Sequence, residues 1–160
     1  MERSVEMISA YRRTLLKVLD GLSMDALNAI PPGFNNNLIW NFGHVVVSQQ
    51  TLCYGNANLK PIIEEAYILK YRKGTKPLKY VDKAEFEILK NYSETALVQL
   101  DKDLENNLFT NITPFVISNY GLEIRNIQDI LKILLNHEGL HLGYCMALKR
   151  AHAKQGNRSL

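Results

Sequence analysis

Apolar residues recur at intervals of three and four along four long segments of the chain, the spacing that aligns side chains on one face of an α-helix. The first segment carries this stripe at Val5, Ile8, Tyr11, Leu15, Val18 and Leu22. The second, LIWNFGHVVVSQQTLCYG, is apolar on more than one side, so we expect a largely buried helix. The last two carry stripes at Phe86, Leu89, Ser93, Ala96, Leu100 and Leu104, and at Ile127, Ile130 or Leu131, Leu134, His137, His141, Cys145 and Leu148.

Capping residues mark where these helices begin. Ser23 is placed to cap a short helix, MDALNAI, which Pro31 and Pro32 end. Asn35 to Asn37 offer caps for the second long helix, and Asp82 with Glu85 forms a capping box for the third.

The remaining segments read as connections. Residues 56–81 form a long connection with one turn of helix at IIEEAY, either a functional cover or a plain surface loop. Short β-prone pieces flank Asn119-Tyr120-Gly121 and predict a small ribbon or an extended crossover. We therefore predict an all-α fold, an antiparallel four-helix bundle with long crossover loops, as one domain over residues 1–160 with a flexible tail at 150–160.

Composition narrows the functional classes. The 160-residue chain is 46% hydrophobic and 22% charged, which is typical of a globular domain, and its net charge of +3 gives no support for nucleic-acid binding. No apolar run reaches the ~20 residues that cross a bilayer, and the N-terminus reads as an amphipathic helix, so we expect neither a membrane span nor a signal peptide. Two cysteines outside any CxxC motif, Cys53 and Cys145, favour reduced, structural thiols in the cytoplasm.

The stretch HEGLH, residues 137–141, fits the H-E-x-x-H motif of zinc proteases. Those enzymes need a third ligand downstream, yet no Asp or Glu follows Glu138, and Ala147 stands where the metzincin pattern has a histidine. No sheet is evident to hold an extended peptide. We therefore reject the protease interpretation.

The same two histidines can still bind a metal inside a helical bundle. Four residues apart on a helix, His137 and His141 leave the same face, and they occupy positions of the apolar stripe. His44, on a helix that is apolar on both sides, is the candidate third ligand. The alternative is that all three are ordinary core histidines with hydrogen-bonding partners.

These features resemble the DinB-like (YfiT-like) superfamily of metal-binding four-helix bundles, over nearly the whole chain. The resemblance rests on the phrases PPGFNNNLIWNFGHV, YRKGTKPL and HEGLHLGYCMALKR. It implies that the histidine after the Trp-x-x-Gly phrase and the pair on the last helix bind one divalent metal; the matching residues are His44, His137 and His141. Leu142, Gly143 and Tyr144 replace an Arg-Gly-Gln that is frequent in the family.

The resemblance also implies a function. Three neutral histidines would leave a divalent ion (zinc, nickel, iron or manganese) an open position for water or a thiol. Some superfamily members transfer a low-molecular-weight thiol to an electrophile, and this is our leading hypothesis for the substrate and reaction. Two alternatives are a metal-dependent small-molecule hydrolase and a non-catalytic metal-binding or dimerisation module. The resemblance further implies a homodimer.

Two more residues are candidates for supporting roles. Glu138 is either a catalytic base beside the metal or an ordinary glutamate facing solvent or a neighbouring helix. Trp40, one turn before His44, either lines a pocket or belongs to the core.

Overall fold

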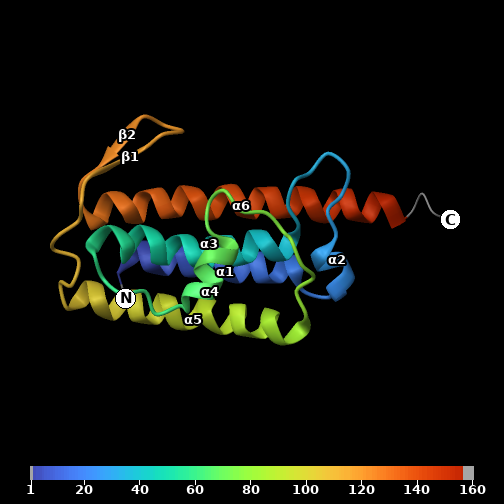
Figure 1. Ribbon diagram of the computed structural model, residues 1–160, viewed down its shortest axis with the longest axis horizontal. Helices are drawn as coiled ribbons and strands as arrows, with labels where there is room; N and C mark the ends of the chain where they lie inside the picture. Colours follow the sequence, from blue (N-terminus) through green and yellow to red (C-terminus); the bar gives the residue numbers. More distant parts are fainter. Residues whose placement is uncertain (1, 157–160) are drawn as a thin grey trace.

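The structure is a computed structural model that describes residues 2–156. It contains, in chain order, α1 (Arg3–Leu19), α2 (Met24–Asn28), α3 (Leu38–Cys53), the 3₁₀ turn η1 (Gly55–Ala57), α4 (Glu65–Tyr71), α5 (Lys83–Glu105), β1 (Phe115–Ile117), β2 (Leu122–Ile124) and α6 (Ile127–Gly156). The prediction of a predominantly helical chain is confirmed (Figure 1).

The predicted N-cap side chains do cap their helices, although the Glu85 carboxylate of the expected capping box accepts from Lys70 and Tyr71 instead. Side chains of Ser23, Asn37 and Asp82 accept hydrogen bonds from backbone N–H groups in the first turns of α2, α3 and α5. Each of these bonds satisfies a donor that has no partner within its helix. The boundaries of α3, which carries His44, are therefore fixed by local chemistry.

The four long helices α1, α3, α5 and α6 lie side by side, and each of them packs against two of the others (Figure 1). Helix α6 contacts both α1 and α3, and α5 contacts the same two helices from the other side. Helix α1 therefore packs mainly on α6, the last helix in the chain, and not on α3, the next long helix after it.

The helices do not all run antiparallel to their neighbours, which corrects the expected arrangement. Along α1 and α6, Arg12 bonds Glu138 and Val18 bonds Lys149, so these two helices run in the same direction. Helices α3 and α5 both run the opposite way, as Figure 1 shows. The physical reason is the long connection after α3, which returns the chain to the other end of the molecule before α5 begins.

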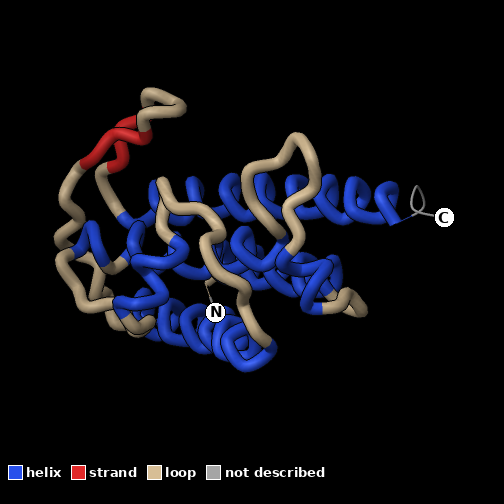
Figure 2. Tube along the Cα trace, turned by 45° about the vertical axis from the view of Figure 1, so that its right-hand side comes forward, coloured by secondary structure: helices blue, strands red, loops and turns tan. Residues whose placement is uncertain are grey.

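The long connection and the ribbon are the main non-helical parts (Figure 2). The connection includes η1 and the seven-residue helix α4, which packs on α3. The ribbon is the predicted one: β1 and β2 pair antiparallel around the turn that contains Gly121, whose φ of 64° suits glycine. The expected tail is helical as far as Gly156, because α6 continues to that residue, and the rest of it lies outside the described residues.

Two apolar clusters fill the interior. One includes Leu15, Phe42 and Leu148, and the other includes Ile8, Leu100 and Leu134. No helix in the described part of the chain is long and apolar enough to cross a membrane.

A buried ion pair also lies in the interior. Arg12 Nε donates to Glu138 Oε1 at 2.9 Å, with both side chains at most 2% exposed. The Arg12 guanidinium also donates to the carbonyls of Val45 and Ser93, and thereby ties α1 to α3, α5 and α6.

We predict that Arg12→Leu lowers the free energy of unfolding by about 3–5 kcal/mol, because it leaves the Glu138 carboxylate buried without its cation. The double variant Arg12→Leu/Glu138→Leu should recover most of that loss. Urea denaturation of the three proteins measures both effects. If the single and double variants were equally stable, the buried unpaired carboxylate would not be the cause of the loss.

Candidate metal centre

The structure brings the three predicted histidines together. His44 lies on α3, and His137 and His141 lie one turn apart on α6, the helix that packs against α3. One ring nitrogen from each lies within 4.8 Å of the corresponding nitrogens of the other two. The ring centroids are separated by 5.1 Å, 4.9 Å and 4.5 Å. His44 is buried, and the other two are half-buried.

Hydrogen bonds at Nδ1 set the tautomers of two of the rings. His44 Nδ1 lies 2.7 Å from the backbone oxygen of Tyr71, which can only accept, so Nδ1 carries the proton. His141 Nδ1 lies 2.8 Å from Asn41 Oδ1. The Asn41 amide is held in that orientation, because its nitrogen donates to the Asn37 carbonyl. Both rings therefore keep a lone pair on Nε2.

The Nε2 atoms of His44 and His137 face each other at 3.2 Å. Ligands of a tetrahedral ion with bonds of about 2.0–2.1 Å lie about 3.3 Å apart, close to this separation. A histidine that binds metal through one nitrogen commonly donates from the other to a carbonyl or carboxylate, as His44 and His141 do here. The donor set and its orientation therefore fit a divalent ion bound by three imidazoles.

Two aromatic residues hold the ring of His44. Trp40, one turn earlier on α3, stacks on it with centroids 4.8 Å apart and planes 9° from parallel. Tyr71 supplies the carbonyl that accepts from Nδ1, and its ring lies against Gly43. A Cβ at Gly43 would lie 2.5 Å from a Tyr71 ring carbon, so only glycine allows this approach.

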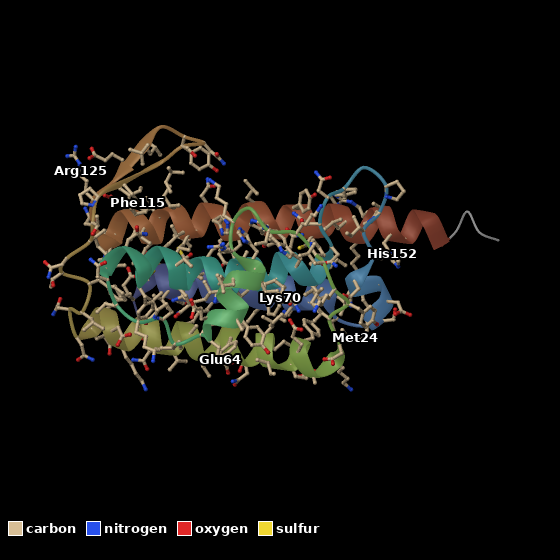
Figure 3. The ribbon with its side chains drawn as sticks, viewed as in Figure 1. Met24, Glu64, Lys70, Phe115, Arg125 and His152 are labelled. Carbon is tan, nitrogen blue, oxygen red and sulfur yellow. The ribbon has the colours of Figure 1, made fainter. Side chains whose placement is uncertain are left out.

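Tyr71 is itself fixed at its other end. Its hydroxyl donates to Glu85 Oε1 at 2.6 Å, and Lys70 Nζ donates to the same carboxylate. Figure 3 labels Lys70 on α4, which lies between α3 and α5 in this view. A few residues on, Thr75 Oγ1 accepts from the Trp40 indole at 3.1 Å. Residues 70–75 thus hold both aromatic residues that contact His44, because Tyr71 belongs to this segment and Thr75 bonds Trp40.

Burial keeps all three imidazoles neutral. It lowers the pKa of His137 to about 3, helped by the nearby His141, His44 and Arg12. The pKa of His141 falls to about 4 because of burial and the neighbouring His44. Burial also lowers the pKa of His44, which the hydrogen bond to Tyr71 partly offsets. At neutral pH the rings therefore present lone pairs, which metal binding requires.

Glu138 lies outside this cluster, although it follows His137 in sequence. Its carboxylate pairs with Arg12 in the protein interior, and Oε2 has no hydrogen-bond partner among the described residues. This placement favours a structural role over that of a catalytic base. The solvent-facing alternative is wrong, because Glu138 is 1% exposed.

The sequence did not predict four contacts of the site, which involve Asn41, Gly43, Ser48 and the backbone carbonyl of Tyr71. Ser48 lies one turn after His44, and its hydroxyl is 3.3 Å from His44 Nε2. The i, i+4 spacing of Ser48 from His44 was the available signal for it. A backbone carbonyl such as that of Tyr71 leaves no signal in the sequence.

We predict that Gly43→Ala weakens metal binding about 10- to 100-fold, because the new methyl group displaces Tyr71 and releases Nδ1 of His44. Titration with zinc against a competing chromophoric chelator measures the affinity. Gly143→Ala is the matched control on α6, since a Cβ there meets nothing within 4 Å. Equal loss in both variants would show that helix chemistry, and not Tyr71, is responsible.

A second prediction concerns pH. His137 and His141 have pKa values near 6.5 in the unfolded chain and of about 3 and about 4 in the metal-free folded protein, so between these values the unfolded state binds more protons. The contribution of these histidines to the free energy of unfolding should therefore be complete above pH 6.5 and should fall steadily as the pH drops from 6.5 towards 3. Urea denaturation of metal-free protein at pH 7 and pH 5 measures the loss. The double variant His137→Gln/His141→Gln should lose less stability between pH 7 and pH 5. A loss equal to that of the original protein would show that these two histidines are not its cause.

Comparison with known protein families gives a match over most of the chain. The profile of the DinB superfamily matches residues 7–145, a span that includes all three histidines and most of the described helices. No curated protein shows significant similarity to the chain.

Proposed function

The chain belongs to the DinB superfamily, and from this and its histidine cluster we propose a metal-dependent enzyme that acts on small molecules. In this proposal the four long helices form the superfamily's metal-binding four-helix bundle. The observation that carries it is the convergence of three neutral imidazoles from α3 and α6, with the Nδ1 protons of two of them held by fixed acceptors.

Three imidazoles would hold the ion through Nε2 of His44, His137 and His141. Three neutral ligands leave a divalent ion with its full charge and a position for an outside ligand, the pattern of catalytic zinc sites. Imidazole suits zinc, nickel, iron and manganese, so the donor set does not select among them. When bound, such an ion lowers the pKa of a water or thiol that it coordinates.

The leading reaction is transfer of a low-molecular-weight thiol to an electrophile. The sulfur forms a bond to an electrophilic carbon, the thiol proton is lost, and any leaving group departs with its bonding pair. The chain's own thiols are unsuited to the task, since burial raises the pKa of Cys53 and Cys145 to about 12. The reacting thiol therefore comes from solution.

Ser48 and the half-buried histidines support binding of an outside ligand. His137 and His141 are only half-buried, and in this proposal a small molecule approaches the ion from their exposed side. The Ser48 hydroxyl beside His44 Nε2 is placed to donate to such a ligand and to orient it. This donor serves hydrolysis as well as thiol transfer, so the reaction itself has to be measured.

We expect untagged protein, purified without metal resin, to contain one divalent ion per chain. His44→Ala and His137→Ala should each reduce this below about a tenth, since each removes one of three ligands. His152→Ala is the matched control, because this histidine lies further along α6 and outside the cluster (Figure 3). Elemental analysis measures the content, and a full equivalent in either ligand variant would refute the site.

A further experiment separates thiol transfer from the alternatives. In cobalt-substituted protein, an added low-molecular-weight thiol should produce a sulfur-to-cobalt charge-transfer band in the near ultraviolet, with loss of the thiol proton. The same thiol should then be consumed with an electrophile such as 1-chloro-2,4-dinitrobenzene at a rate that depends on the metal. A thiol that leaves the cobalt spectrum unchanged would exclude thiol transfer at this centre and leave hydrolysis as the alternative.

A further inference from the structure

A cavity of about 390 Å³ lies on the far side of the two residues that hold His44. Trp40, Tyr71 and Val81, all nearly buried, form its inner wall. The segment around Pro77 and Leu78 forms its outer edge, where Leu78 is 81% exposed. The volume lies within the range of small-molecule binding sites, about 300–1,000 Å³.

The charged residues that line this cavity are all lysines. Three lysines, Lys70, Lys76 and Lys79, line it, and no Asp or Glu is among the described residues that do. Lys70 is neutralised by Glu85, which lies behind it. Lys76 and Lys79 stand on the exposed segment and leave a positive edge on an apolar wall.

We propose that this cavity is a binding site for a small organic anion, an apolar or aromatic body that carries a carboxylate. The body packs against Trp40, Val81 and Leu78, and the carboxylate faces Lys76 and Lys79. An apolar wall with a few charged groups at its edge is the usual composition of a small-molecule site. A neutral ligand of the same shape forgoes the attraction of both lysines and binds more weakly.

The cavity and the histidine cluster share a wall. Trp40 stacks on His44 with one face and lines the cavity, and Tyr71 both lines the cavity and accepts the His44 Nδ1 proton. A bound anion therefore contacts the residues that position His44 without contacting a histidine. The site does not depend on metal, so it stands independently of the catalytic proposal.

The single tryptophan of the chain makes the site directly measurable, because Trp40 is the only source of indole fluorescence. The probe is 4-nitrobenzoate, a carboxylate whose nitroaromatic ring quenches indole on contact, titrated into metal-free protein. We expect saturable quenching, and at least tenfold weaker binding of 4-nitrobenzamide, which has the same shape without the charge. Quenching that rises linearly without saturation would overturn the proposal.

Matched variants locate the charge. Lys76→Ala/Lys79→Ala should weaken 4-nitrobenzoate about tenfold or more and leave the amide unchanged. Lys60→Ala/Lys73→Ala removes the same charge from exposed positions that do not line the cavity, and it should bind normally. An equal loss of affinity in both double variants would show that only the net charge of the protein matters, and would overturn the proposed site.

One more variant separates this site from the metal centre. His137→Ala, titrated in the same way with and without zinc, should keep its affinity for 4-nitrobenzoate, because His137 does not line the cavity. If binding requires zinc and is lost in this variant, the anion binds at the metal and the cavity proposal fails while the metal proposal stands. Binding of 4-nitrobenzoate that persists in a variant unable to hold zinc would support the cavity site.

Discussion

Two hydrogen bonds at Nδ1 determine what the histidine cluster can do. The Tyr71 carbonyl and the Asn41 amide oxygen can only accept, so they hold the protons of His44 and His141 on Nδ1 and leave Nε2 of each ring with a lone pair. An imidazole free to exchange tautomers would present this lone pair only part of the time. Further hydrogen bonds fix both acceptors, because the Asn37 carbonyl orients Asn41 and Glu85 anchors Tyr71.

Each neutral ring carries one nitrogen lone pair, which lies on Nε2 in His44 and His141, and a cation can satisfy these lone pairs. Burial lowers the pKa of every ring in the cluster, so protons do not satisfy them at neutral pH. A divalent ion satisfies all three at once. The buried Arg12–Glu138 pair adds rigidity beside the cluster, because it ties α6, which carries two of the histidines, to α1, α3 and α5. Metal affinity and helix packing are therefore linked through α6.

Periodicity predicted the helices and the shared face of His137 and His141, and the resemblance to the DinB-like superfamily added His44 as the third ligand. Positions 137 and 141 share a helical face by spacing alone, and His44 sits in a helix too apolar to lie on the surface. Periodicity could not identify Arg12 as a buried residue. Position 12 lies one turn after the buried Ile8, but buried arginines are rare, and the apolar stripe includes its neighbour Tyr11 instead. Nor could it reveal the carbonyl of Tyr71 or the direction of α1 relative to α6, which depend on contacts between distant segments.

The metal site that we propose requires three imidazoles to bind one ion together. X-ray absorption spectroscopy of the zinc-loaded protein tests it most directly, because outer-shell scattering from imidazole rings counts the histidine ligands. We expect three imidazoles at about 2.0–2.1 Å and one or more oxygen ligands that are not imidazole. Two imidazoles or fewer, or a site completed by cysteine sulfur, would contradict it.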